Sequence, residues 1–154
     1  MQSYLRGDDM LWIGILIAVL SGALMSVQGV CNTGATKAAG LWVTGTFVSL
    51  TAAAVCLLLW FVTGREGDFS ALMQIRPRYL LLGGVLGAFI TGTVVLSIAK
   101  LGTARAEMVI VLAQLATAYV ISVCGWLGSE QEAFSWSRLC ALGIALAGVM
   151  WYSC

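Results

Sequence analysis

Five apolar stretches, each long enough to cross a lipid bilayer, take up most of this 154-residue chain. A spanning helix needs about 20 mostly apolar residues. The stretches cover residues 10–36, 41–63, 79–99, 108–126 and 138–152. Their apolar residues are continuous rather than alternating, which favours helices over a membrane barrel. The sequence therefore predicts an all-α membrane protein with five transmembrane helices in a single domain, residues 1–154.

The composition agrees with this prediction. Hydrophobic residues make up 60% of the chain and charged residues 10%, and a soluble domain of this size could not bury that much apolar surface. Asp8 and Asp9 precede an apolar run that is too long for a signal peptide, so we expect no cleavable signal. Amphipathic aromatic rings prefer the headgroup level. The tryptophans lie at or near predicted span ends: Trp12, Trp42, Trp60, Trp126, Trp136 and Trp151.

The connections between the predicted spans exclude several classes of function. The longest, residues 64–78, is too short for a soluble catalytic or nucleic-acid-binding domain, so we expect no nucleic-acid partner. The chain has no histidine, and its five cysteines form no CxxC motif, so we expect no metal site, no cofactor and no disulfide framework. No pair of acids lies within a span, which argues against an intramembrane enzyme.

The basic residues give only a weak orientation signal. With five spans, the N-terminus shares a side with the second and fourth loops, and that side holds Arg6, Arg65, Arg76, Arg78 and Arg138. The other side holds Lys37, Lys100 and Arg105. Orientation follows this bias, and five against three permits two orientations in one membrane. Two copies, one of them inverted, would form a ten-helix bundle with an inverted repeat, a known transporter plan. A single orientation with a modest bias is the alternative.

Three predicted helices each carry a polar face. At 100° per residue, one arc of the first helix holds Ser21, Met25, Gln28, Asn32 and Thr36. The fourth places Glu107, Gln114, Ala118, Ser122 and Gly125 together, and the third aligns Thr93, Ser97 and Lys100. Polar side chains are costly in lipid, so we expect these faces to meet in a common interior. Amide groups there could hold a polar or cationic solute.

Each polar residue also has a structural interpretation. Interhelical hydrogen bonds would explain them equally simply, and each is worth about 0.6 to 2 kcal/mol. For Gln28, Asn32 and Gln114 the solute path is favoured. A bond to the carbonyl one turn back is favoured for the hydroxyl residues Ser21, Thr36, Thr93, Ser97 and Ser122. Glu107 could bind a proton in competition with solute, although a place near the helix N-terminus explains it somewhat better.

Small residues mark surfaces on which helices could pack closely. Gly83, Gly84, Gly87 and Ala88 form overlapping small-xxx-small pairs in the third span. Ala141, Ala145 and Gly148 do the same in the fifth, which has almost no polar residue inside it. A helix of this kind suits contact between subunits, so the sequence predicts a dimer interface there, with packing inside one subunit as the alternative.

From about Leu16 to Met150, the chain resembles the YdcZ-type family of half-size, five-helix inner-membrane exporters in the drug/metabolite transporter superfamily. Short sequence motifs of that family are present in this chain. The first predicted helix matches at Gly22, Gln28 and Asn32, and the third matches at Gly83, Gly84, Leu86, Gly87 and Ala88. Leu101, Gly102 and Ala104 follow, and then Gln114 and Leu115. Ala113, Ser122 and Cys124 stand where the family commonly has glycine, aspartate and phenylalanine. The missing acid argues against a proton coupling or cation preference taken from the family.

The resemblance implies a ten-helix dimer in a bacterial inner membrane, with four helices per subunit lining the path and the fifth supporting dimerisation. The leading hypothesis is therefore a transporter subunit, not an enzyme, that moves a small organic solute by alternating access. Its partner would be a second copy, antiparallel to the first, or a paired homologous chain. A non-transporting scaffold or regulatory subunit is the alternative hypothesis.

Overall fold

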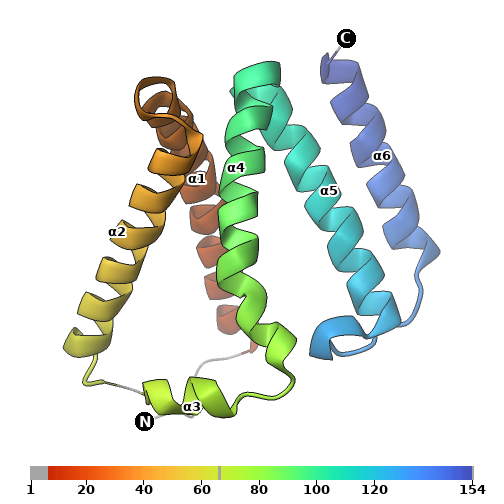
Figure 1. Ribbon diagram of the computed structural model, residues 1–154. Helices are drawn as coiled ribbons and strands as arrows, with labels where there is room; N and C mark the ends of the chain where they lie inside the picture. Colours follow the sequence, from red (N-terminus) through yellow and green to blue (C-terminus); the bar gives the residue numbers. More distant parts are fainter. Residues whose placement is uncertain (1–6, 66, 154) are drawn as a thin grey trace. The chain divides into compact units, whose positions relative to one another are not determined.

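Helices make up all the regular secondary structure in the described part of the chain. The computed structural model describes residues 7–65 and 67–153 (Figure 1). In chain order the elements are α1 (Gly7–Ala39), α2 (Leu41–Val62), α3 (Phe69–Gln74), η1 (Arg78–Leu82), α4 (Gly83–Leu101), α5 (Thr103–Cys124), η2 (Trp126–Gly128) and α6 (Trp136–Ser153). The two η elements are short 3₁₀ helices. The all-α prediction is confirmed.

Four helical segments of the described chain are long and apolar enough to cross a membrane, judged by length and composition. They are Leu11–Ala39, Leu41–Val62, Arg78–Leu101 and Thr103–Cys124. The fifth apolar segment forms a shorter helix, Trp136–Tyr152. Four of the five predicted spans therefore correspond to long apolar helices, and the last one to a helix near the lower end of what a bilayer requires.

Two boundaries differ from those expected. α1 continues to Ala39 without a break, and α5 begins at Thr103 rather than near residue 108. The expected loop over residues 100–107 was wrong, because a single residue, Gly102, joins α4 to α5. Glu107 consequently lies inside α5 and not at its first residue.

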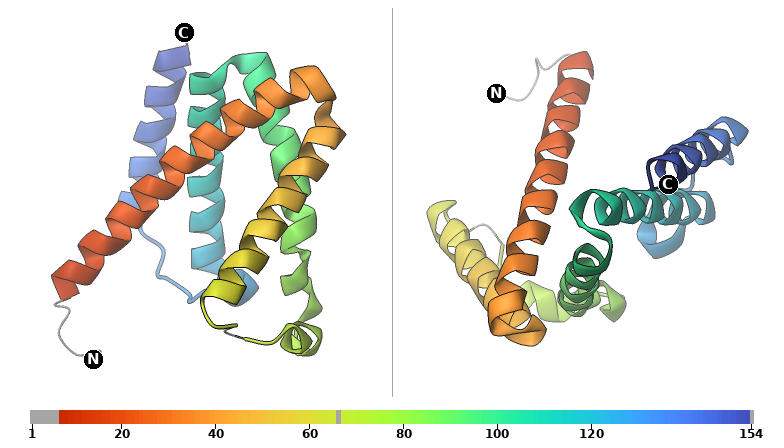
Figure 2. Two further views of the ribbon diagram at one scale, coloured as in Figure 1. Left: turned by 90° about the vertical axis from the view of Figure 1, so that its left-hand side faces the viewer. Right: turned by 90° about the horizontal axis from the view of Figure 1, so that it is seen from above.

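The chain divides into two compact units, residues 1–96 and 97–154. In the first unit, α1 and α2 contact each other and are joined through Gly40. Figure 2 shows that they diverge with distance from this turn. The buried residues of both helices lie near the turn, and they include Asn32, Thr33 and Thr44.

Gly40 and Gly102 form almost the same turn. Their backbone angles are φ 88°, ψ 157° and φ 80°, ψ 159°, in a region that L side chains rarely adopt. Each glycine N–H donates to the carbonyl four residues earlier at 2.9 Å, and each carbonyl accepts from the N–H four residues later at 3.1 Å. A single glycine can therefore reverse the chain between two long helices while keeping both of its own hydrogen-bonding groups occupied.

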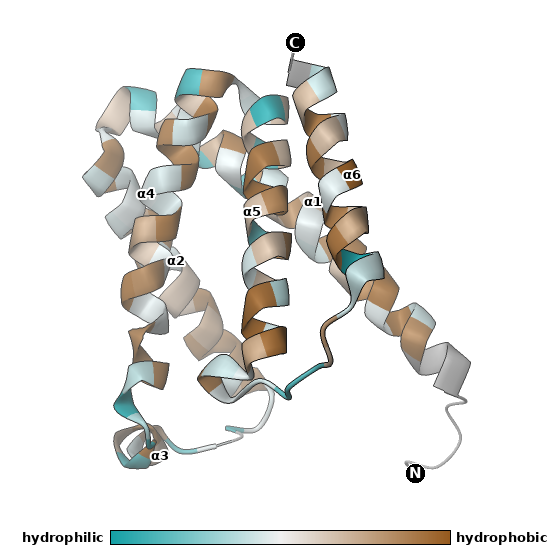
Figure 3. Ribbon diagram, turned by 90° about the vertical axis from the view of Figure 1, so that its right-hand side faces the viewer, coloured by the Kyte–Doolittle hydropathy of each residue, from teal (hydrophilic) through white to brown (hydrophobic). Residues whose placement is uncertain are grey.

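In the second unit, α5 and α6 contact each other, and Figure 3 shows hydrophilic residues in the loop that joins them. That loop is held by Tyr119, whose hydroxyl donates to the Ser135 carbonyl and accepts from the Ser135 N–H, both at 3.0 Å. The Glu132 N–H donates to the Ser122 carbonyl at 2.9 Å, and Glu132 forms an ion pair with Arg138. Tyr119 thus has a structural role in this unit.

Candidate functional site

The polar stripe of α1 is buried only near the Gly40 turn. Asn32 is 9% exposed, whereas Ser21 and Gln28 are exposed and Met25 is 47% exposed. α1 is continuous, so the predicted residues do lie on one helix, but the protein covers only the end of the stripe nearest α2. Asn32 is therefore the predicted α1 residue that has the most enclosed surroundings.

Two buried hydroxyl groups lie on either side of the Gly40 turn. The Thr36 and Thr44 Oγ1 atoms are buried and have no hydrogen-bond partner among the described residues. Both residues are tied to the same turn, since the Gly40 N–H donates to the Thr36 carbonyl and the Thr44 N–H donates to the Gly40 carbonyl. Asn32 lies one helical turn before Thr36, on the same face of α1. We call Asn32, Thr36 and Thr44 the turn cluster.

The two unpaired hydroxyls differ from those of most other threonines in the described chain. Six other threonines donate to the carbonyl one turn back, at distances from 2.8 to 3.0 Å: Thr33, Thr46, Thr51, Thr63, Thr91 and Thr93. This bond is the ordinary way for a helical hydroxyl to avoid an unmet hydrogen bond in apolar surroundings. Because Thr36 and Thr44 do not make it, their hydroxyls remain available to another polar group.

The other predicted site residues lie in the second unit. Ser97, Glu107 and Ser122 are half-buried there, and Gln114 is exposed. Ser97 belongs to α4, and the remaining three belong to α5. The structure therefore places the predicted set in two separate groups, the α1 stripe in one unit and these four residues in the other.

Interhelical hydrogen bonding by these residues is not found in the described chain. Ser21 donates to the Ile17 carbonyl of its own helix at 2.9 Å, as expected for a serine in a helix. The side chains of Gln28, Asn32 and Gln114 make no hydrogen bond with another described residue. These amides therefore do not link helices by hydrogen bonds within the described part of one chain.

The small-residue surfaces are open within the subunit. A Cβ built at Gly83, Gly84, Gly87 or Gly148 would meet nothing within 4 Å. Close packing of these glycines inside one subunit, the alternative expected for α4 in particular, is thus not seen in the described part of the chain. On α6, Ala141 and Gly148 are exposed, and Ala145 is half-buried.

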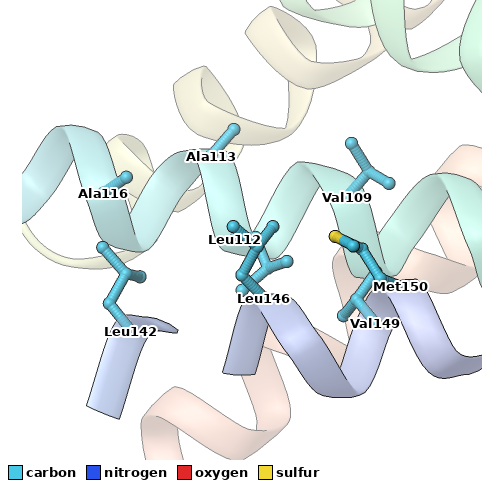
Figure 4. A pocket seen from close by; sticks show the side chains of 8 residues that line it. All are labelled: Val109, Leu112, Ala113, Ala116, Leu142, Leu146, Val149 and Met150. Atoms are coloured by element: carbon cyan, nitrogen blue, oxygen red, sulfur yellow. The ribbon is translucent and has the colours of Figure 1, made fainter. Parts of the chain in front are cut away.

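An apolar groove of about 560 Å³ lies between α5 and α6. Figure 4 shows its lining, which consists of Val109, Leu112, Ala113, Ala116, Leu142, Leu146, Val149 and Met150. None of these side chains carries a hydrogen-bonding group suited to a polar solute. The groove therefore suits acyl chains or another apolar helix better than it suits a solute.

Sequence comparison assigns the chain to a known family. The family model described as "Putative inner membrane exporter, YdcZ" matches residues 13–151, which include the turn cluster and every predicted site residue. This chain belongs to the YdcZ family. Comparisons with curated proteins and with solved structures found no match.

Membership in the YdcZ family agrees with the helices described above. The family is one of inner-membrane transporters of the drug/metabolite type and not of enzymes, and the long apolar helices of this chain are those of an integral membrane protein. Thr44 is the cluster residue that sequence reasoning missed. Its signal was weak, since it is a single hydroxyl in the first turn of an otherwise apolar helix.

Proposed function

We propose that this YdcZ-family chain is one half of a transporter that moves a small organic solute, in the direction of export, by alternating access. The observation that carries the proposal is the turn cluster. An unpaired buried polar group costs about 1 to 3 kcal/mol, and the cluster holds two buried hydroxyls without a hydrogen bond in the described chain, next to Asn32, which is 9% exposed. A solute passing between helices would supply the missing partners.

The second half of the transporter is a second copy in antiparallel orientation, or a paired homologous chain. α6 would cross the membrane as the fifth span, because its 18 residues extend about 27 Å at 1.5 Å per residue. The open surface of Ala141, Ala145 and Gly148 supports contact through α6. An odd number of spans and a weak charge bias support inversion of one copy. The complete assembly would contain ten helices.

Each unit carries residues that we expect to contact the solute. Asn32, Thr36 and Thr44 would hold the solute near one membrane surface. Gln28 in the first unit and Gln114 in the second offer amides that form no hydrogen bond with a described residue, and Glu107 offers a carboxylate. Met25, Ser97 and Ser122 would line the path, and Ser21 would contribute least because its hydroxyl is already bonded.

Ligand-dependent thermal stability tests this proposal even while the solute is unidentified. The purified protein is screened against a panel of small metabolites, and a solute that binds the folded state raises the melting temperature. The Asn32→Ala variant should lose the shift seen with the hit compound. The matched control is Ser21→Ala, which removes a hydroxyl bonded to its own helix and should keep the shift.

Two outcomes would count against the proposal. If no compound stabilises the wild-type protein and reconstituted vesicles show no solute flux, the scaffold or regulatory function replaces it. If a compound stabilises both variants equally, the turn cluster is not part of the binding site, and the proposal loses the observation that carries it.

A further inference from the structure

The segment between α2 and α4 has a structure that solute transport does not explain. It contains α3, a six-residue helix, and the 3₁₀ helix η1. Figure 1 shows α3 running across the ends of α2 and α4 rather than along them. Both neighbouring helices are candidate spans, so a segment across their ends lies at the level of the lipid headgroups.

α3 exposes apolar side chains at this level. Phe69 is 54% exposed, Leu72 46% and Met73 84%. Such exposure in water is unfavourable, by about 25 cal/mol for each Å² of apolar surface. The same side chains are stabilised where headgroups meet acyl chains, which is how interfacial helices bind membranes.

Arginines flank α3 on both sides. Arg65 lies over the rings of Trp60 and Phe61, with its guanidinium carbon 5.9 Å and 4.8 Å from the ring centroids. Phe69 packs against Trp60 with a centroid distance of 5.0 Å. These contacts hold one guanidinium and the start of α3 at the end of α2. On the other side of α3, Arg76 and Arg78 are exposed and form no ion pair with a described residue.

The segment also contains two acids, Glu66 and Asp68. Glu66 lies outside the described residues. The Asp68 carboxylate caps α3 by accepting from the Ser70 hydroxyl at 2.6 Å and from the Ser70 N–H at 3.0 Å. These bonds hold the pKa of Asp68 below its ordinary value. The Asp68 carboxylate therefore stays ionised while it caps α3, and it forms no ion pair with Arg76 or Arg78 in the described chain.

We propose that residues 67–78 form an anchor that binds anionic phospholipid. Phe69, Leu72 and Met73 enter the upper acyl region of one leaflet, and Arg76 and Arg78 bind lipid phosphate groups. The anchor fixes the shared end of α2 and α4 to that leaflet. It is independent of the proposed transport function, because it would serve a scaffold equally well.

Lipid retention tests the basic part of the anchor. The protein is extracted from bilayers of phosphatidylcholine and phosphatidylglycerol, and native mass spectrometry counts the lipids that stay bound. Wild type should retain phosphatidylglycerol preferentially. An arginine near the surface contributes about 1 kcal/mol to such binding, so the double variant Arg76→Gln/Arg78→Gln should weaken it on the order of 30-fold. The matched control is Arg138→Gln, on the same predicted side, because Arg138 is already paired with Glu132.

Membrane depth tests the apolar part and does not depend on the arginine variants. A nitroxide attached to a Met73→Cys variant, with the native cysteines replaced, should collide with oxygen more often than with a water-soluble nickel complex. Preferential collision with the nickel complex would place α3 in water and overturn the anchor. Poor access to both reagents would mean that protein covers α3, which also overturns it. Equal lipid retention by wild type and the double variant would remove the arginines from the proposal.

Discussion

We expect the hydroxyl of Thr44 to lower the free energy of unfolding. The side chain is 4% exposed, and its Oγ1 has no partner among the described residues. We expect Thr44→Val, which keeps the shape and removes the hydroxyl, to raise the free energy of unfolding by about 1 kcal/mol. Thermal unfolding of the purified protein in detergent measures the change. Solute binding should weaken in the same variant.

Thr46→Val is the matched control for this prediction. Thr46 lies two residues farther along α2, is exposed, and donates to the Trp42 carbonyl at 2.9 Å. Its replacement should leave stability within about 0.5 kcal/mol of wild type. A clear loss of stability in Thr44→Val would mean that its hydroxyl has a partner in the assembled protein.

The turn cluster also marks how far single residues could be predicted from the sequence. The position of Asn32 on a polar face of α1 was expected, because polar residues at helical spacing in an apolar segment have few explanations. The expectation that the Thr36 hydroxyl bonds the carbonyl one turn back was wrong, since its Oγ1 has no partner among the described residues. The burial of Thr44 was not predictable, because it depends on the Gly40 turn, and a turn through one residue is hard to distinguish from a short loop. The exposure of Gln28 likewise depends on the point at which α2 diverges from α1. The helical periodicity of the sequence does not indicate that point.

At the scale of elements, the two single-glycine turns should be equally sensitive to substitution. The φ angles of Gly40 and Gly102 are 88° and 80°, and a Cβ added at either would meet nothing within 4 Å. The cost of Gly40→Ala or Gly102→Ala is therefore backbone strain alone, about 1 to 3 kcal/mol for each. Gly45→Ala, in the helical interior of α2 and equally open, should instead stabilise by about 0.5 to 1 kcal/mol. Thermal unfolding of the three variants checks this ordering, which an equal response of all three would contradict.

Helix identity was predictable from the sequence, but some helix ends were not. Continuous apolar runs gave α2 its limits to within one residue, because Gly40 and Gly64 bracket it. The charged residues of 100–107 suggested a loop. However, Thr103, Ala104, Arg105 and Ala106 are all compatible with a helix, so α5 begins immediately after Gly102. Charged residues indicate where a helix leaves the apolar part of the membrane. The position at which the helix ends is set by the backbone conformation, here by the turn at Gly102.

At the scale of the whole molecule, disulfide crosslinking can distinguish an antiparallel dimer from a parallel one. Ala141 and Gly148 lie four residues before and three residues after Ala145, so Ala145 marks the centre of the α6 surface. In an antiparallel pair, Ala145→Cys should crosslink to itself, and Ala141→Cys should crosslink to Gly148→Cys on the other copy. Gly148→Cys alone should not crosslink. The native cysteines are first replaced, and dimer formation is read on a non-reducing gel.

The crosslinking experiment also has results that would contradict an antiparallel dimer. Efficient crosslinking of Gly148→Cys to itself would indicate a parallel dimer and contradict the inverted arrangement. Absence of every crosslink, with folded protein confirmed by thermal unfolding, would move the contact away from α6. Neither result would affect the assignment to the exporter family, which depends on sequence.

The length of α1 has a consequence for how the protein meets its membrane. Its apolar segment, Leu11–Ala39, has 29 residues and measures about 44 Å, whereas the 22 residues of α2 measure about 33 Å. The hydrocarbon layer is about 30 Å thick. α2 can therefore stand nearly upright, while α1 must tilt strongly, extend into the headgroups or thicken the bilayer locally. Because Gly40 fixes one end of both helices, longer acyl chains would bring α1 upright and narrow the angle between them. Hydrophobic mismatch thus becomes a means by which lipid composition sets the shape of the α1–α2 hairpin.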